Sequence, residues 1–269
     1  MDSQVATAFD AISQRYDEAM SAAVNPVVAL VRERVYRSIE GHCAAGSRLL
    51  EIGCGTGEDA VALARRGYQI VASDVSAGMV EMTRAKVAAS GCAEAVQIVG
   101  KGVGALAAEW PSLGLAVAGV FSNLAPLNCE LSLEPLRRLL EQALPVGGRF
   151  VAVVLPRICP LEIAIFIARG QPGAALRRFR RDPVADVDGA RFPMRYYGAG
   201  DFDRALGPAF RRVETRSLGL VLPPLGFGAA LARVPRVTRA LALVDDGLSG
   251  LPALRRMGDH VLLAYQRRW

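Results

Sequence analysis

Three glycines at alternate positions constrain the fold of this chain more than any other feature. They are Gly53, Gly55 and Gly57, and they lie between a short apolar run, Arg48 to Ile52, and a helical pattern that ends at Gly67. This order predicts a strand, a tight turn and a helix. Glycine lets the backbone turn sharply and lets a ligand lie against it, and the free amides at a helix start favour polar or anionic groups. We therefore expect a flat or extended ligand at this turn.

A second predicted strand, Gln69 to Ser73, ends directly before Asp74. In a βαβ unit, a carboxylate at the tip of the second strand is placed to accept hydrogen bonds from both hydroxyls of a ribose. The ligand predicted from the glycine turn and this acid is a nucleoside. A dinucleotide fingerprint would need glycine at position 58, where this chain has Glu58, so a nicotinamide-dependent dehydrogenase is disfavoured.

The pattern E-x-G-x-G-x-G from Glu51 to Gly57, followed by QIVASDVSAGMVEMTRAK, resembles the donor-binding motifs of class I S-adenosylmethionine-dependent methyltransferases. The resemblance runs from about Phe9 to Phe150 and resumes near Tyr196. It implies an α/β fold with a Rossmann-like, doubly wound, seven-stranded mixed sheet, an antiparallel last strand and helical cap insertions. It also implies S-adenosylmethionine as the cofactor and S-adenosylhomocysteine as its product.

The same resemblance suggests which residues bind the donor. The segment from Phe9 to Asp17 matches F-D-x-x-x-x-x-Y-D, which folds over the donor in similar enzymes, and its Tyr16 can meet the donor carboxylate. After the third predicted strand, where the family usually has an acid, this chain has Lys101, so the backbone of the next two residues is the expected contact. The expected donor-binding residues are Tyr16, Glu51, Gly53, Cys54, Gly55, Gly57, Asp74, Val75, Met79, Gly102, Val103, Asn123 and Leu124.

Three of these residues also have a purely structural interpretation. Tyr16 can simply pack in an amphipathic lid helix, and Met79 can belong to the core. Asn123 follows the fourth predicted strand, Leu115 to Ser122, in a loop whose Ser122 and Asn128 are further candidates, and Asn there can instead form an Asx-type turn. Both interpretations are open for each residue.

A chain of 269 residues is expected to form one α/β domain with added caps. The expected parts are N-terminal lid helices over 1–45, the donor-binding core over 46–155, a cap insertion over 156–200, and core strands over 201–269 with a second insertion over 223–258. The apolar run Leu161 to Ala168 is too short to span a bilayer. It can cover an apolar pocket, rest at a membrane surface or pack on the core.

The net charge of +6 comes almost wholly from arginine, which can simply reflect the composition of the source genome. One cluster contains Arg177, Arg178, Arg180 and Arg181, and such a cluster can hold an anionic lipid or a phosphorylated substrate. Aromatic residues do not interleave with it, so no nucleic-acid partner is expected. Five cysteines without a C-x-x-C motif suggest neither disulfides nor zinc, and we predict no metal site. With a polar N-terminus unlike a signal peptide, this predicts a cytoplasmic protein.

His260 is the candidate catalytic residue. The last predicted strand, Asp259 to Gln266, must begin at the ligand-facing edge if it runs antiparallel to its neighbours, and His260 is one of two histidines in the chain. An imidazole titrates near neutrality and can accept the proton that a hydroxyl loses on methylation. Alternatively, Asp259 and His260 only tie the second insertion to the strand.

The predicted acceptor follows from the caps. Their apolar side chains and basic flank favour a small lipophilic molecule, and an anionic head such as a diphosphate or carboxylate would explain the arginines. The apolar residues are Ile163, Ile165, Phe166, Ile167, Leu220, Leu222, Leu225 and Phe227. We expect a methyltransferase of natural-product biosynthesis that acts on oxygen or carbon of such a metabolite. The alternatives are a peripheral membrane lipid methyltransferase and a non-catalytic S-adenosylmethionine-binding partner protein; the oligomeric state stays open.

Overall fold

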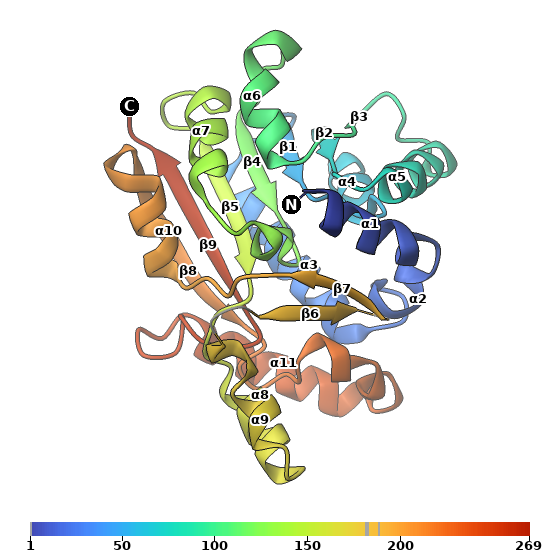
Figure 1. Cartoon of the computed structure of the whole chain (residues 1–269), viewed down its shortest axis with the longest axis vertical. Coiled ribbons are helices and arrows are strands. Elements are labelled where there is room, and N and C mark those ends of the chain that lie inside the picture. The colour runs from blue at the N-terminus through green and yellow to red at the C-terminus, as the bar shows by residue number, and fades with distance from the viewer. Residues whose placement is uncertain (1, 181–182, 188) are drawn as a thin grey trace.

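The computed structural model describes residues 2–180, 183–187 and 189–269, so Arg181 of the basic cluster lies outside the described residues. A seven-stranded sheet forms the centre of the molecule, and a two-stranded hairpin crosses one end of it (Figure 1). The strands of the sheet are β1 (Arg48–Ile52), β2 (Gln69–Ser73), β3 (Val96–Val99), β4 (Gly119–Ser122), β5 (Arg149–Val154), β8 (Phe210–Leu218) and β9 (His260–Arg267).

The strand order is β3-β2-β1-β4-β5-β9-β8, and β9 is antiparallel to both of its neighbours, β5 and β8. The predicted mixed sheet with an antiparallel last strand is therefore confirmed. The chain winds in opposite directions from β1 and β4, which are paired in parallel. Ligands of such sheets bind at this switch point, outside the carboxyl ends of the strands.

The strand bounds agree closely with the sequence pattern except at β4. The prediction began this strand at Leu115, but β4 begins at Gly119. The preceding helix, α6 (Val103–Leu113), ends at Gly114 in a left-handed conformation, and the next residues form a connection whose Ala118 N–H donates to Arg48 O at 2.8 Å. An apolar composition alone did not separate this connection from the strand.

Helices cover both faces of the sheet, which explains why its strands are apolar throughout. On one face, α6, α7 (Glu134–Ala143) and α10 (Ala199–Leu206) bury side chains such as Trp110, Leu139 and Phe202. On the other face lie α3 (Pro26–His42), α4 (Glu58–Ala64) and α5 (Ala77–Ser90). The 3-10 turn η2 (Pro126–Cys129) adds the buried Leu127 to the core, and η4 (Gly207–Ala209) leads into β8.

The N-terminal lid consists of α1 (Asp2–Ile12), η1 (Ser13–Arg15) and α2 (Tyr16–Met20). A break before Pro26 separates the lid from α3, where Asn25 caps the helix and its Oδ1 accepts a hydrogen bond from Val27 N at 3.1 Å. Asn25 Nδ2 also donates to Leu225 O at 2.9 Å, which ties this break to the second insertion.

The first insertion contains α8 (Pro160–Ala168), α9 (Pro172–Ala175), η3 (Arg177–Phe179) and the hairpin of β6 (Val184–Val187) and β7 (Ala190–Pro193). The second contains η5 (Leu225–Arg233) and α11 (Pro235–Ser249). Helices α8 and α9 project from one end of the molecule, while the hairpin runs across to the lid (Figure 1). The sequence analysis did not predict this hairpin. Within the described part of the chain, no helix is long and apolar enough to cross a membrane.

Candidate active site

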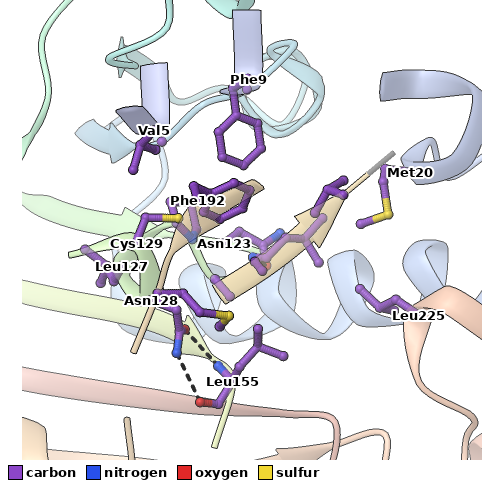
Figure 2. A pocket seen from close by; sticks show the side chains of 18 of the residues that line it. Val5, Phe9, Met20, Asn123, Leu127, Asn128, Cys129, Leu155, Phe192 and Leu225 are labelled. Carbon is purple, nitrogen blue, oxygen red and sulfur yellow. Dashed lines mark hydrogen bonds between the residues drawn. The ribbon is translucent and has the colours of Figure 1, made fainter. Parts of the chain in front are cut away.

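One cavity of about 630 Å³ lies at the carboxyl ends of β1, β2 and β4 and extends to the first residue of β9. The lid helix α1 and the hairpin cover it, and the rings of Phe9 and Phe192 meet there with centroids 5.0 Å apart (Figure 2). Its volume lies within the usual range of small-molecule sites. The cavity is therefore large enough for two small ligands side by side or one extended ligand.

The glycine turn has a different reason for glycine at each position. Gly53, Gly55 and Gly57 all have left-handed backbones, with φ of 73°, 54° and 80°. A Cβ on Gly53 would lie 2.3 Å from Pro126 Cβ, and one on Gly57 would lie 2.7 Å from Thr83 Cγ2. A Cβ on Gly55 would meet nothing within 4 Å, and Gly55 lines the cavity. The turn thus leaves its middle residue open to a ligand.

The carboxylate of Asp74 is held in place by the backbone around it. Gly55 N donates to Asp74 Oδ2 at 2.9 Å, and Ser76 N donates to Oδ1 at 3.0 Å. Burial raises the pKa of Asp74, although these backbone hydrogen bonds oppose the shift. Each carboxylate oxygen can accept a further hydrogen bond. This geometry fits the two hydroxyls of a ribose.

The lid is anchored through the two acids of its F-D and Y-D pairs. Asp10 Oδ1 accepts from Ser76 Oγ at 2.6 Å and from Gly78 N at 2.8 Å. Asp17 accepts from Thr56 Oγ1 at 2.6 Å and pairs with Lys86 Nζ at 2.6 Å. The sequence analysis considered the aromatic residues of this motif and missed the anchoring role of its acids.

The aromatic partners of those acids, Phe9 and Tyr16, line the cavity. Burial raises the pKa of Tyr16 to about 12, so its hydroxyl keeps its proton at neutral pH and can donate a hydrogen bond to an anionic group. Tyr16 thus lines the cavity and also packs in the lid, with its ring centroid 6.3 Å from that of Phe9, so both interpretations of this residue remain open.

All of the expected donor-binding residues line this cavity except Glu51 and Gly57. Gly57 lies behind the turn against Thr83, as described above. Glu51 is buried, and its Oε2 has no hydrogen-bond partner among the described residues. Burial, and then the nearby charge of Asp59, raise the pKa of Glu51 well above its usual value. Burial therefore favours the protonated form of this acid.

The amide of Asn123 is used within the protein. Its Nδ2 donates to Asp59 Oδ2 at 3.1 Å, and its Oδ1 accepts from Leu124 N at 2.8 Å. The amide is thus engaged within the protein, although the bond from Leu124 N is not the Asx-type turn of the structural interpretation, which would use the N–H two residues on. The next two residues, Leu124 and Ala125, have φ of 56° and 70°, which is unusual for residues other than glycine and typical of functional loops.

The remaining candidates in the loops differ in whether they line the cavity. Asn128 lines the cavity, but its amide binds backbone atoms, with Nδ2 donating to Leu155 O at 3.1 Å and to Arg195 O at 2.6 Å (Figure 2). Ser122 is buried, donates to Ile52 O at 2.9 Å and is not part of the lining. Lys101 does line the cavity, and its Nζ pairs with Glu109 at 2.8 Å.

Arg32 was not predicted as a site residue, but it lines the cavity from α3. It belongs to the part of the cavity beside the glycine turn and Asp74, which is called the donor half below because these residues are expected to bind the methyl donor. Its Nη1 lies 2.5 Å from Asp59 Oδ1, and Tyr36 Oη donates to the same oxygen at 2.5 Å. Arg32 Nε is buried without a hydrogen-bond partner in the described structure. The available signal was its position one turn after Val28 and before Val35, where an arginine interrupts the buried face of the helix.

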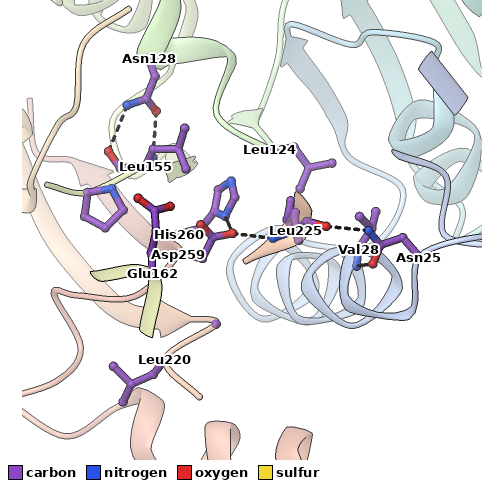
Figure 3. Close-up of polar contacts among 12 residues, drawn as sticks. Asn25, Val28, Leu124, Asn128, Leu155, Glu162, Leu220, Leu225, Asp259 and His260 are labelled. Atoms are coloured by element: carbon purple, nitrogen blue, oxygen red, sulfur yellow. Dashed lines mark hydrogen bonds and ion pairs between the residues drawn. The ribbon is translucent and has the colours of Figure 1, made fainter. Parts of the chain in front are cut away.

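At the far end of the cavity, His260 is buried beside Asp259 (Figure 3). His260 Nδ1 lies 3.1 Å from Asp259 Oδ2, without the geometry of a hydrogen bond, and that oxygen accepts from Leu225 N at 3.0 Å. Burial alone would raise the pKa of Asp259, but the adjacent His260 and Arg178 hold it well below its usual range. The two residues thus both face the cavity and tie the second insertion to β9.

Arg178 of the basic cluster is engaged within the protein and is not free to hold an anionic substrate head. Arg178 is buried, and each of its five N–H groups donates to protein oxygens of Glu162, Asp259 or Pro156. Arg177 donates to both oxygens of Glu162, at 3.0 and 2.8 Å. Arg180 is exposed and donates to Gly173 O. The cluster is therefore largely structural, because it neutralises buried acids of the insertions.

Of the apolar cap residues expected to meet the acceptor, Phe166, Leu225 and Phe227 line the cavity. The Phe166 and Phe227 rings contact edge to face, with centroids 6.3 Å apart. Ile167 is instead 59% exposed on the outer side of α8. The two insertions therefore meet over the end of the cavity that contains His260, which is called the acceptor end below.

Three side chains in the described residues converge in the manner of metal ligands. Potential ligand atoms of Cys159, Glu162 and Asp259 all lie within 4.8 Å of one another. Burial raises the pKa of Cys159 to about 11, which keeps the thiol protonated. Arg178 Nη2 lies 2.7 Å from an oxygen of each carboxylate. The guanidinium therefore already supplies the positive charge that these two acids require.

Comparisons with known proteins agree with this architecture. Residues 49–143 match the model of a methyltransferase domain. A demethylmenaquinone methyltransferase from Clavibacter sepedonicus is 33% identical over 88 residues, which cover 32% of this chain and 34% of the relative. The chain thus matches about a third of the length of this curated relative.

Two solved structures share the fold over most of the chain. The CcbJ methyltransferase from Streptomyces caelestis has a TM-score of 0.61 at 18% identity and covers 98% of both chains. A geranyl diphosphate C-methyltransferase from Streptomyces coelicolor A3(2), solved with Mg²⁺, geranyl diphosphate and S-adenosyl-L-homocysteine, has a TM-score of 0.54 at 16% identity and covers 87% of this chain and 78% of that one. The chain therefore has the fold of the class I S-adenosylmethionine-dependent methyltransferases, and its match to a methyltransferase domain over residues 49–143 contains the glycine turn and Asp74.

Proposed function

We propose that this protein transfers a methyl group from S-adenosylmethionine to oxygen or carbon of a small lipophilic metabolite. The observation that supports this best is the continuity of the cavity, which joins the glycine turn and Asp74 to the aromatic cap residues and His260. A donor at one end and an acceptor at the other would share one covered space. Holding two reactants in line contributes a large part of the rate of such a transfer.

The residues of the donor half fit S-adenosylmethionine, whose sulfonium methyl is displaced in line by a nucleophile. Asp74 would accept the ribose hydroxyls, and Gly55 would allow the ligand to lie against the backbone. Arg32 lines the cavity near this turn, and its Nε is buried without a hydrogen-bond partner in the described structure. Such a group suits the carboxylate of the amino acid end of the donor.

The acceptor half favours an apolar molecule. Aromatic and aliphatic side chains from both insertions and the lid line it, including Phe9, Phe166, Phe192, Leu225 and Phe227. The similar proteins named for demethylmenaquinone and for geranyl diphosphate are consistent with such an acceptor. Since Arg178 is fully engaged, an anionic head on the acceptor would have to rely on Arg177, which is 46% exposed and also lines the cavity.

His260 is the proposed general base for an acceptor hydroxyl or acidic carbon. It lines the cavity, while Asp259 contacts its Nδ1 side and is itself fixed by Leu225 N and Arg178. Asp259 would then act as a positioning residue that orients the ring. Proton removal by a positioned base contributes about 10²- to 10⁴-fold to a rate.

The first test is calorimetric titration of the purified protein with S-adenosylmethionine and S-adenosylhomocysteine, with Asp74→Ala in parallel. We expect micromolar binding, about 8 kcal/mol, and a loss of about tenfold or more in the variant, since a charged hydrogen-bond acceptor is removed. Binding of neither ligand would contradict the proposal.

Activity is then tested on a panel of hydrophobic phenols, quinones and prenyl compounds. His260→Ala should lower the rate about 10²-fold or more without weakening donor binding, whereas His42→Ala should not, because His42 lies outside the cavity and pairs with Glu214. Donor binding with no turnover on any small molecule would instead favour a non-catalytic S-adenosylmethionine-binding partner protein.

A further inference from the structure

We propose that the end of the molecule formed by α8, α9, η3 and α11 docks on an anionic lipid bilayer and presents the acceptor end of the cavity to it. The docking itself is independent of catalysis, and only the delivery of the acceptor from the bilayer rests on the function proposed above. In this arrangement a lipophilic acceptor would reach the site without crossing bulk water.

The first observation is an unpartnered apolar stripe on α11. Val237, Ala240, Leu243 and Val244 follow helical spacing and lie on one side of the helix, whereas Thr238, Ala242 and Asp245 are buried on the other. Val237, Leu243 and Val244 are 51%, 69% and 52% exposed. An exposed apolar stripe on a surface helix marks an interaction site.

The second observation is a matching set of exposed apolar side chains on the first insertion. Ile167 at the end of α8, Leu176 after α9 and Phe179 in η3 are 59%, 58% and 53% exposed. Helices α8, α9 and α11 lie at the same end of the molecule in Figure 1. The apolar residues therefore belong to a single end rather than being scattered over the surface.

The third observation is the charge around these residues. Arg169, Arg180, Arg233, Arg236 and Arg239 are exposed, and none of them forms an ion pair with another described residue. Glu162, the one acid from 156 to 180, is buried against Arg177 and Arg178. Asp245 and Asp246, the acids of α11, pair with Arg34. Among the described residues of this surface, the exposed arginines outnumber the acids, since the one partly exposed acid, Asp246, is paired with Arg34. Such a surface complements anionic head groups.

The position of the cavity connects this surface to the site. Phe166 of α8 and Phe227 of η5 both line the acceptor end, and Arg169 lies over the Phe227 ring at 4.8 Å. From Phe227 the chain continues through η5 directly into α11. The apolar and basic side chains therefore surround the elements that line the acceptor end of the cavity.

Charge also decides between a bilayer and a second copy of the chain. A symmetric dimer through this surface would place arginines opposite arginines, and like charges across an interface cost several kcal/mol. An anionic bilayer would pair the same arginines with phosphates while taking up the apolar side chains. The bilayer is therefore the favoured occupant.

The experiment is flotation of the full chain with two kinds of vesicle. One contains phosphatidylcholine alone, and the other contains about 30% phosphatidylglycerol, whose negative charge attracts basic segments. We expect flotation only with the anionic vesicles. Arg236→Gln with Arg239→Gln should weaken it about 30-fold, at about fivefold per charge. Val237→Ser with Leu243→Ser should also abolish or strongly weaken it. Arg138→Gln with Val146→Ser, which removes an exposed arginine and an exposed valine elsewhere, is the matched control and should float as wild type.

Failure of the wild type to float, or equal flotation of all variants, would overturn the proposal. So would a wild-type dimer in gel filtration that Val237→Ser with Leu243→Ser converts to a monomer, because a second copy would then occupy the surface. Donor titration separates this result from the proposed function: the surface variants should bind S-adenosylmethionine as wild type, and Asp74→Ala should float as wild type.

Discussion

Arg178 Nη2 donates a hydrogen bond of 2.7 Å to Asp259 Oδ1 and thereby joins the two insertions across 81 residues of sequence. The same guanidinium binds both oxygens of Glu162 on α8. One buried arginine thus connects the cap, the start of β9 and, through Asp259 and Leu225 N, the second insertion. The acceptor end of the cavity depends on this connection for its shape.

Replacing Arg178 by Met should destabilise the protein by about 3 to 5 kcal/mol, because two buried carboxylates would lose their shared partner. The matched control is Arg180→Met, which removes an exposed arginine of the same segment and should change stability by less than about 0.5 kcal/mol. Urea unfolding followed by circular dichroism measures both. Equal stability of the two variants would show that the buried ion pairs do not hold the insertions.

The ion pairs of Glu162 with Arg177 and Arg178 predict that the protein loses stability in acid. Burial alone would raise the pKa of Glu162, but hydrogen bonds from Arg178 and Arg177 outweigh it and lower that pKa. A pKa that is lower in the folded than in the unfolded state stabilises the fold above the unfolded value, about 4.3 for Glu, and this contribution is lost as pH falls towards the folded value.

The unfolding free energy should therefore fall as pH drops below about 4, and the fall should be smaller in Glu162→Gln, which has no carboxyl to protonate. Glu81→Gln removes an exposed acid on α5 and should keep the wild-type pH dependence. Urea titrations at several pH values from neutral to acid test this. A pH slope in Glu162→Gln as steep as in wild type would contradict the role of this pair.

Gly53→Ala should abolish donor binding and destabilise the protein, because the new Cβ would lie 2.3 Å from Pro126 at a φ of 73°. The expected cost is about 1 to 3 kcal/mol from strain and overpacking. Gly41→Ala is the control: Gly41 lies in α3, its Cβ would meet nothing within 4 Å, and a gain of up to about 1 kcal/mol is expected. Calorimetry measures donor binding, and thermal unfolding measures stability. Similar effects of the two substitutions would refute this account of the turn.

Asp17→Ala should loosen the lid without unfolding the core, since it removes the contacts to Thr56 and Lys86. Hydrogen exchange of residues 2–20 should speed up, and donor affinity should fall severalfold. Glu18→Ala changes the neighbouring exposed acid and should leave both unchanged. Unaltered exchange in Asp17→Ala would mean that the Asp10 contacts and the packing of Phe9 and Tyr16 hold the lid without Asp17.

Local signals explain how much of the fold could be predicted. The bounds of β1 and β2, the Ser76 cap of α5 and the break at Asn25 each depend on a few adjacent residues. The position of β9 was inferred from the resemblance and is confirmed. The hairpin β6–β7 escaped prediction because its two strands are only four residues each and are held in place by packing of Phe192 against Phe9.

By itself, the sequence determined the glycine turn and the acid at the tip of β2, because a tight turn and the end of an apolar strand are encoded in neighbouring residues. The mixed sheet was expected only because the sequence motifs resemble those of a known family. Only the tertiary structure decided the rest of the site. It showed that Arg178 donates its hydrogen bonds to Glu162, Asp259 and Pro156, and that Arg32 reaches the donor half of the cavity. It also showed that Glu51 is buried and that its Oε2 has no hydrogen-bond partner among the described residues. The charge state and availability of a side chain depend on groups far away in the sequence, and only folding brings those groups together.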